Sequence, residues 1–253
     1  MGEQVLIGSG RTADVYTWDS GQVIKLFVAD YPKTAVEREF RLAQLLNPLD
    51  FPKPKAYEMV LWESRWGIVY EHIIGESLLT WVLRTMNVEQ CANRLATLHT
   101  FILQNTVAEL PSYKEFLHWG ISKATSLSPH ERNRALQHLN ELPDESHLCH
   151  GDFHPGNVLI HEEKSVVLDF MNVCRGPILY DIARTVYLVQ YTAMPDSNSE
   201  SAEIKQFREN LANLYIHNMG VLREQLAPYL TVIHWARRGE APEEVSTYKG
   251  CFV

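Results

Sequence analysis

The segment that decides the fold is HGDFHPGN, residues 150–157, followed by VLI at 158–160 and VVLDF at 166–170. Residues 158–161 and 165–168 predict two short strands around a polar turn. A hairpin centred on Glu163 would place Asn157 and Asp169 opposite each other, with Cβ atoms roughly 5 Å apart. Amide and carboxylate oxygens at that separation suit Mg²⁺. Asp152, five residues before Asn157, can accept a proton from a substrate hydroxyl beside such a metal.

The composition is that of an ordinary soluble globular protein. The chain has 253 residues, 45% hydrophobic and 21% charged, with a net charge of −8, which disfavours binding to nucleic acids and anionic membranes. No apolar run approaches the ~20 residues of a membrane span and no signal layout opens the chain, so we expect a cytoplasmic protein. The four cysteines form no CxxC pair, which argues against a zinc site; the sequence does not indicate an oligomeric state.

The chain divides into a β-rich part and a helical part. Strand patterns at 5–7, 15–18 and 23–28 precede a helix that begins after Pro32, and two further strands follow, at 57–62 and 67–71. Residues beyond about 77 have a helical pattern. Asn87 and Gln90 resemble a capping box, and His99 lies beside an apolar stripe, which is typical of a core histidine. Residues 194–201 predict a loop, and residues 202–226 have a similar helical pattern. We predict an N-lobe at 1–74, a C-lobe at 75–253, and a ligand cleft between them.

Two N-terminal features suggest phosphate binding. Gly8, Ser9 and Gly10 occupy a turn between two strands, where glycines let backbone N–H groups approach phosphate oxygens; the same residues also suit an ordinary hairpin turn. A strand-like segment follows them, which disfavours a Rossmann fold. Lys25 shares a strand face with apolar Val23 and Phe27, so its ammonium needs an anion, unless it reaches water from an edge strand.

The combined pattern, HxDxxxxN followed by DF, resembles the catalytic and metal-binding loops of the protein-kinase-like fold. HGDFHPGN is most similar to the aminoglycoside phosphotransferase and choline kinase branch of that fold. The resemblance extends from Gly8 to Arg184. It implies an α+β, two-lobed fold, with a small antiparallel sheet and one helix in the N-lobe and a larger, mainly helical C-lobe.

The resemblance also implies roles for the central motif. Asp152 would be the catalytic base, and Asn157 and Asp169 would hold Mg²⁺. His154 stands where many protein kinases have a lysine that contacts the transferred phosphate; alternatively, it only hydrogen-bonds the loop. Gly151 replaces an arginine of protein kinases, which argues against control by activation-loop phosphorylation.

Further implied roles lie outside that motif. Lys25 would bind the α- and β-phosphates of ATP. The backbone at Glu71 and Ile73 would hydrogen-bond the edge of the adenine ring, and Tyr70 would control access to the pocket behind that ring. Asp181 would support the catalytic loop. The helix after Pro32 offers two carboxylate partners for Lys25, namely Glu37 and Glu39. Glu39 lies in the apolar stripe, whereas Glu37 has the spacing of an exposed ion pair with Arg41, so Glu39 is preferred.

We therefore expect an ATP- and Mg²⁺-dependent phosphotransferase acting on a hydroxyl of a small molecule of aminoglycoside, choline or sugar type. The excess of acidic over basic residues favours a cationic acceptor. Three alternatives are a nucleotide-binding regulator without catalysis, a metal-dependent phosphoesterase, and a protein kinase. Retention of the proposed base argues against the regulator, and the glycine-rich turn with Lys25 argues against the phosphoesterase.

Overall fold

The structure is a computed structural model that describes residues 4–10, 12–192 and 201–242. The chain forms two compact units: unit 1 comprises Met1–Ser77 and Val158–Met171, and unit 2 comprises Leu78–Asn157 and Asn172–Val253. These units differ from the predicted lobes because residues 158–171 group with the N-terminal part. The division at residues 74 and 75 stays a prediction.

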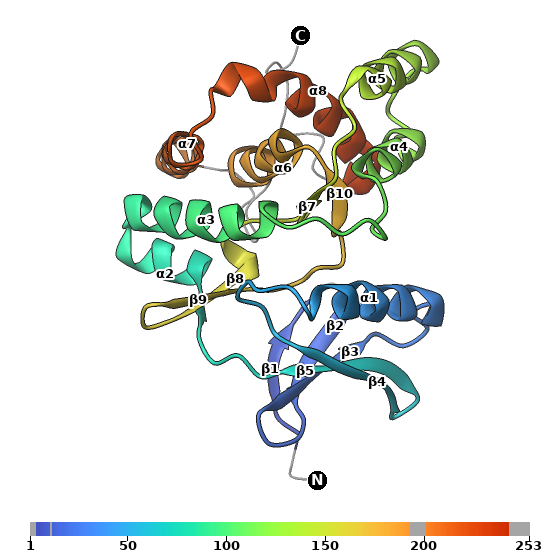
Figure 1. Cartoon of the computed structure of the whole chain (residues 1–253), viewed down its shortest axis with the longest axis vertical. Helices are drawn as coiled ribbons and strands as arrows, with labels where there is room; N and C mark the ends of the chain where they lie inside the picture. Colours follow the sequence, from blue (N-terminus) through green and yellow to red (C-terminus); the bar gives the residue numbers. More distant parts are fainter. Residues whose placement is uncertain (1–3, 11, 193–200, 243–253) are drawn as a thin grey trace. The chain divides into compact units, whose positions relative to one another are not determined.

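Unit 1 contains a five-stranded antiparallel sheet with the order β1-β2-β3-β5-β4 (Figure 1). The central strand, β3, pairs Lys25 with Val15 of β2 on one side and with Ile68 of β5 on the other. Two ladders therefore fix the place of Lys25 in the sheet. The strands are β1 (Leu6–Ser9), β2 (Ala13–Thr17), β3 (Gln22–Phe27), β4 (Ala56–Trp62) and β5 (Arg65–Glu71).

Helix α1 (Lys33–Leu46) packs on this sheet and contacts β4 and β5 (Figure 1). It begins directly after Pro32, whose fixed φ suits a helix start. Its buried residues, spaced three or four apart, are Val36, Glu39, Leu42 and Leu46. The carboxylate of Glu39 therefore lies on the buried face of an amphipathic helix.

A second sheet of unit 1 has the order β6-β8-β9. Its strands are β6 (Glu76–Ser77), β8 (Val158–His161) and β9 (Lys164–Val167). The ladder pairs Val158 with Val167 and His161 with Lys164, which leaves a turn of only two residues.

The predicted register of this hairpin, with Asn157 opposite Asp169, is wrong by one residue. The centre lies between Glu162 and Glu163 and not on Glu163, because the strands close one residue earlier than expected. Glu162 adopts φ 55°, the left-handed conformation that tight hairpins need and that Gly or Asn normally supplies. No such residue signalled the shorter turn.

Unit 2 is mainly helical, with a two-stranded antiparallel sheet of β7 (His147–Cys149) and β10 (Cys174–Gly176). Helix α6 packs against both α7 and α8 and is buried on nearly every side from Tyr180 to Val189, as expected of a central helix (Figure 1). The helices are α2 (Leu78–Thr85), α3 (Val88–Leu103), α4 (Tyr113–Lys123), α5 (Pro129–Glu141), α6 (Ile178–Tyr191), α7 (Ala202–Asn218) and α8 (Arg223–Glu240).

The α+β fold class is confirmed, and so are several local predictions. Asn87 caps α3 and accepts the N–H of Gln90 at 3.0 Å, and His99 is fully buried. The stretch 202–226, expected to be helical, forms α7 as far as Asn218 and the start of α8 from Arg223, and the break between them includes Gly220 at φ 68°. The loop expected at 194–201 lies, except for Ser201, outside the described residues.

Candidate active site

Lys25, Glu39 and Asp169 form an ion cluster within unit 1. Nζ of Lys25 lies 2.7 Å from Oε1 of Glu39 and 3.2 Å from Oδ1 of Asp169. Strand β3 supplies the lysine, α1 supplies Glu39, and Asp169 follows β9. The side chain of Glu39 is only 7% exposed, whereas that of Asp169 is 40% exposed. The cluster thus has a buried structural carboxylate and a second carboxylate that a ligand can reach.

The electrostatics of the cluster keep Lys25 cationic. Burial alone would lower the pKa of Lys25, but attraction to Asp169 and Glu39 outweighs burial and raises it. Burial raises the pKa of Glu39, and the attraction of Lys25 offsets only part of that effect. The hydroxyl of Tyr70 donates to Oε1 of Glu39 at 3.5 Å, and burial raises the pKa of Tyr70 well above its usual value.

Asp169 has an unusual backbone conformation. Its φ is 59°, in the left-handed region that residues other than glycine adopt infrequently. The ring of the next residue, Phe170, packs against Phe51 with centroids 5.7 Å apart. Strain of this kind persists where surrounding packing enforces it, and it concentrates at binding sites.

The glycine-rich turn between β1 and β2 has the contacts of a hairpin. The N–H of Gly10 donates to the carbonyl of Ala13 at 2.9 Å, and the hydroxyl of Ser9 donates to Asp14 at 2.7 Å. The bond from Ser9 lowers the pKa of Asp14. Phosphate binding by Gly8, Ser9 and Gly10 stays a prediction.

The end of β5 and the residue that follows it are held by hydrogen bonds to backbone groups. The N–H of Glu71 donates to the carbonyl of Lys55 at 2.9 Å, and its carboxylate accepts the N–H of Lys55 at 3.2 Å. The N–H of the next residue, His72, donates to Gly21 at 2.9 Å. Adenine binding by the backbone at Glu71 and Ile73 stays a prediction, and at Glu71 it would use the carbonyl.

Asp152, His154 and Asn157 lie on one loop of unit 2, which follows β7 and ends in a 3-10 turn at Pro155–Asn157. Nδ2 of Asn157 donates to the backbone carbonyl of Asp152 at 2.8 Å and lies 3.4 Å from its Oδ2. Because the amide nitrogen faces Asp152, the amide oxygen is the atom of Asn157 that can bind a cation.

His154 makes the loop hydrogen bond that the sequence offered as one alternative. Its Nδ1 accepts the N–H of Gly156 at 3.1 Å. A neutral imidazole that accepts at Nδ1 carries its proton on Nε2. The contact therefore presents His154 as a hydrogen-bond donor at Nε2, and a role toward phosphate stays a prediction.

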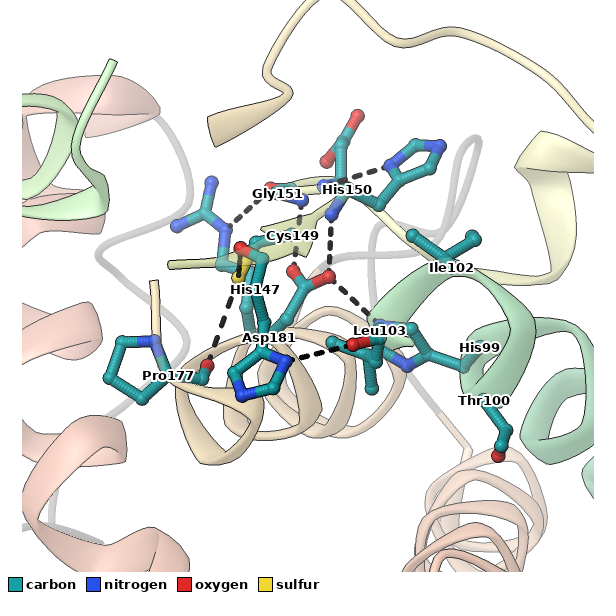
Figure 2. A network of polar contacts seen from close by, with 12 residues as sticks. His99, Thr100, Ile102, Leu103, His147, Cys149, His150, Gly151, Pro177 and Asp181 are labelled. Atoms are coloured by element: carbon teal, nitrogen blue, oxygen red, sulfur yellow. Dashed lines mark hydrogen bonds and ion pairs between the residues drawn. The ribbon is translucent and has the colours of Figure 1, made fainter. Parts of the chain in front are cut away.

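Asp181, on α6, holds the start of this loop (Figure 2). Its carboxylate accepts the N–H groups of His150 at 2.5 Å and Gly151 at 2.9 Å, and Nε2 of His99 lies 2.8 Å from its Oδ2. Nδ1 of His99 lies 2.5 Å from the hydroxyl of Tyr215 on α7. Burial would raise the pKa of Asp181, but interactions with His99, His150 and the N–H of Gly151 outweigh burial and lower it.

Gly151 has no space for a side chain. It adopts φ 75°, and a Cβ there would lie 2.3 Å from the carbonyl oxygen of Asn172. An arginine at position 151 would therefore not fit this backbone. The carbonyl of Gly151 accepts a bond from Nε of buried Arg184 at 3.1 Å, and the same guanidinium bonds both oxygens of Glu240.

A cavity of about 530 Å³ lies beside the loop within unit 2. Asp152 and His154 line it from the loop, and α2, α6, α7 and α8 supply most of the remaining lining. Its volume is typical of small-molecule sites. A hydroxyl compound in this cavity would meet both polar side chains of the loop.

The structure thus brings the predicted residues together in two groups. Lys25, Glu39 and Asp169 meet in unit 1, and Asp152 and Asn157 meet in unit 2, with His154 on the same loop. The predicted residues of the glycine-rich turn and the segment after β5 lie on unit 1, outside the ion cluster. Among the described residues, no three His, Cys, Asp or Glu side chains are grouped to hold a metal ion.

Sequence reasoning missed two supports of the loop. Arg184 lies three residues after Asp181, on the same side of a helix that is otherwise largely apolar, and this isolated charge was an available signal. Tyr215 gave no signal, because it reaches His99 across 116 positions of sequence.

Comparison with known proteins agrees with this architecture. The model of the family described as "Phosphotransferase enzyme family" matches residues 3–224. A thermostable mutant of aminoglycoside phosphotransferase APH(4)-Ia, in complex with AMP-PNP and hygromycin B, superimposes with a TM-score of 0.65 at 15% identity, over 96% of this chain and 88% of that one. No curated protein sequence matches this chain.

Two further solved structures share the fold. The amicoumacin kinase hAmiN, in complex with AMP-PNP and Ca²⁺, has a TM-score of 0.63 at 14% identity, over 96% of this chain and 84% of that one. APH(3'')-Id from Streptomyces rimosus, in complex with ADP and streptomycin, has a TM-score of 0.62 at 14% identity, over 92% of each chain. No described helix has the length and apolar character needed to cross a membrane.

Proposed function

Because this chain belongs to the phosphotransferase enzyme family, we propose that it transfers the γ-phosphate of ATP to a hydroxyl group of a small molecule. The similar solved structures that contain AMP-PNP or ADP together with hygromycin B or streptomycin support this assignment. The observation that carries it is the position of Asp152, which lines a cavity of ligand size and is held by the amide of Asn157.

Unit 1 supplies groups that suit a nucleoside triphosphate. Lys25 is kept cationic and is oriented by buried Glu39, so its ammonium can neutralise phosphate oxygens. Asp169 of unit 1 offers a carboxylate oxygen, and the amide oxygen of Asn157, which belongs to unit 2, is the second ligand that we propose for Mg²⁺. Bound Mg²⁺ would offset the negative charge of the phosphates during transfer.

Unit 2 supplies the proton acceptor. Asp152 would take the hydroxyl proton of the acceptor molecule as the hydroxyl oxygen attacks the γ-phosphorus. The Nε2–H of His154 would donate a hydrogen bond to phosphate, since its Nδ1 is engaged by Gly156. Asp181 and Arg184 hydrogen-bond the backbone of Gly151 and would act by keeping the loop in position.

The experiment is acceptor-dependent ADP release from MgATP, screened over alcohols, sugars, amino alcohols and aminoglycosides. We expect Asp152→Asn to lower kcat by about 10²–10⁴, as for loss of a general base, with MgATP still raising the melting temperature. The matched control is Asp144→Asn, which removes an exposed carboxylate paired with Lys114 and should change kcat less than twofold.

Three outcomes would contradict the proposal. Turnover that survives Asp152→Asn would remove the base from its assigned role. MgATP binding without ADP release for any hydroxyl compound would favour a nucleotide-binding regulator. The absence of any thermal shift with MgATP would favour a phosphoesterase.

A further inference from the structure

The cavity beside Asp152 is lined mainly by apolar side chains. Nine of its sixteen lining residues are Leu, Ile, Val, Met, Phe or Pro. Phe207 and Leu211 of α7 contribute to this apolar lining, together with Leu79 of α2. A ligand of this cavity therefore buries apolar surface against it.

The charged lining does not suit a polycation. Among the described residues, the cavity has two carboxylates, Asp152 and Glu203, and two guanidinium groups, Arg208 and Arg237. Asp152 is assigned to the acceptor hydroxyl, which leaves Glu203 as the one other carboxylate among the described lining residues. Arg237 already pairs with Glu240 at 3.3 Å. A ligand with several ammonium groups would lose its hydration in the cavity with only this described carboxylate to compensate for them.

Two exposed apolar residues extend the apolar lining to the surface. Leu83 is 44% exposed and Met86 is 61% exposed, and both line the cavity. Met86 also lines an adjoining depression with Phe207 and Val88. Large apolar side chains that meet solvent at the rim of an apolar cavity are typical of a site that a ligand covers.

We propose that the acceptor is a hydroxyl compound with a predominantly apolar body and at most one positive charge. This inference rests on the proposed function and names the substrate class of the same site. The hydroxyl oxygen forms a bond to the γ-phosphorus of ATP, the bond from that phosphorus to the β-phosphate oxygen breaks, ADP leaves, and Asp152 takes the hydroxyl proton. The proposal replaces the cationic acceptor that the net charge favoured.

The test measures binding and turnover separately. Calorimetric titrations use the full chain saturated with AMP-PNP and Mg²⁺, and the probes are 1,10-decanediol, octyl glucoside and 10-amino-1-decanol, with gentamicin and hygromycin B as polycations. ADP release from MgATP is then measured with the same compounds. We expect at least one apolar probe to bind more tightly than either polycation and to release ADP.

A matched pair of variants places the binding in the cavity. Leu83→Glu adds a charge at an exposed lining residue and should weaken binding of the apolar probe at least tenfold. Phe101→Glu makes the same kind of change on α3, at a residue that is 46% exposed and does not line the cavity, and should change binding less than twofold. Met86→Glu replaces Leu83→Glu if the latter lowers the melting temperature of the free protein.

The outcomes separate this inference from the proposed function. Tighter binding of gentamicin or hygromycin B than of every apolar probe, failure of every apolar probe to bind, or equal effects of the two variants, overturns the inference. Leu83-dependent binding of an apolar probe, without ADP release for any hydroxyl compound of the wider screen, supports the apolar ligand class of the cavity and contradicts the proposed function. ADP release with the polycations alone supports the proposed function and overturns the inference.

Discussion

Nε2 of His99 lies 2.8 Å from Oδ2 of Asp181, and neither side chain is exposed to solvent. Because Asp181 also accepts the N–H groups at the start of the loop that carries Asp152, His99 acts on that loop through Asp181 as a positioning residue. We expect His99→Ala to lower the free energy of unfolding by about 3 kcal/mol, since it leaves a buried carboxylate short of a partner. It should also lower kcat more than it changes KM. Urea unfolding and steady-state kinetics check this, and His99→Gln, which can still donate to Asp181, should recover part of both losses.

The lowered pKa of Asp181 predicts a pH dependence of stability. The ionised carboxylate is favoured in the folded state, so its contribution is complete above the unfolded value of about 3.9 and is lost as the pH falls below it. We expect the difference in unfolding free energy between the wild type and Asp181→Asn to narrow as the pH falls below about 4. A difference that stays constant from pH 7 to pH 3 would contradict this assignment.

Glu39 and Glu37 lie on the same helix, but we expect their substitution to have different effects on activity. Glu39 is buried against Lys25, whereas Glu37 forms an exposed pair with Lys33 at 3.2 Å. We expect Glu39→Gln to lower kcat/KM for ATP at least tenfold, which corresponds to about 1.4 kcal/mol, because Lys25 loses the charge that orients it. Glu37→Gln should change kcat/KM less than twofold, as expected for an exposed ion pair. Equal effects of the two substitutions would argue against this role of Glu39.

Gly21 and Gly151 have similar positive φ angles but different surroundings, so alanine substitutions distinguish the cost of the backbone conformation from the cost of a steric clash. Gly21 has φ 72° and no heavy atom within 4 Å of the position that a Cβ would take, whereas a Cβ on Gly151 would lie 2.3 Å from the carbonyl of Asn172. We expect Gly21→Ala to cost about 1 kcal/mol of unfolding free energy, from the left-handed conformation alone. Gly151→Ala should cost clearly more and should also lower kcat. Chemical denaturation of both variants is the measurement. Equal losses of unfolding free energy would show that the loop accommodates a side chain at position 151 without further cost.

His234 predicts a second pH dependence, at higher pH. Burial, assisted by Arg238, lowers the pKa of His234 to about 4, and its Nδ1 lies 3.1 Å from the hydroxyl of Tyr187. The unfolded chain binds this proton near pH 6.5, so stability falls as the pH falls from about 6.5 toward 4. We expect the wild type to lose about 1–2 kcal/mol more than His234→Gln over this range, a figure reduced for the partial exposure of the ring to solvent. If the unfolding free energies of the two proteins changed with pH in parallel, His234 would be ruled out as the cause of the loss of stability.

The features that the sequence predicted well have local causes. Pro32 marks the start of α1, and Asn87 with Gln90 marks the start of α3, because caps act within one turn of helix. The contact between Lys25 and Glu39 was predicted from two periodic patterns: Lys25 shares one face of a strand with apolar residues, and Glu39 lies in the apolar stripe of a helix. Each of these predictions required only the spacing of residues that are close together in the sequence.

The features that the sequence did not predict depend on distant contacts or on unusual backbone angles. Arg184 meets Glu240 across 56 positions, and no local pattern reports such a pairing. Glu162 adopts φ 55° without the glycine that would signal it, so the hairpin register was predicted one residue off. The apolar character of the cavity likewise arises mainly from three helices that are separate in sequence, α2, α6 and α7.

The grouping of residues 158–171 with unit 1 means that the polypeptide passes between the units three times, after Ser77, after Asn157 and after Met171. Neither unit can be produced as an uninterrupted fragment. A truncation after Ser77 would omit β8 and β9, and a chain beginning at Leu78 would carry both strands without β6, which pairs with β8. The second passage separates Asn157 from Val158, between the two proposed metal ligands in sequence. Expressing the parts before and after Ser77 separately would place Lys25 and Asp169 on different fragments, so the proposed chemistry must be assayed on a chain that contains both units.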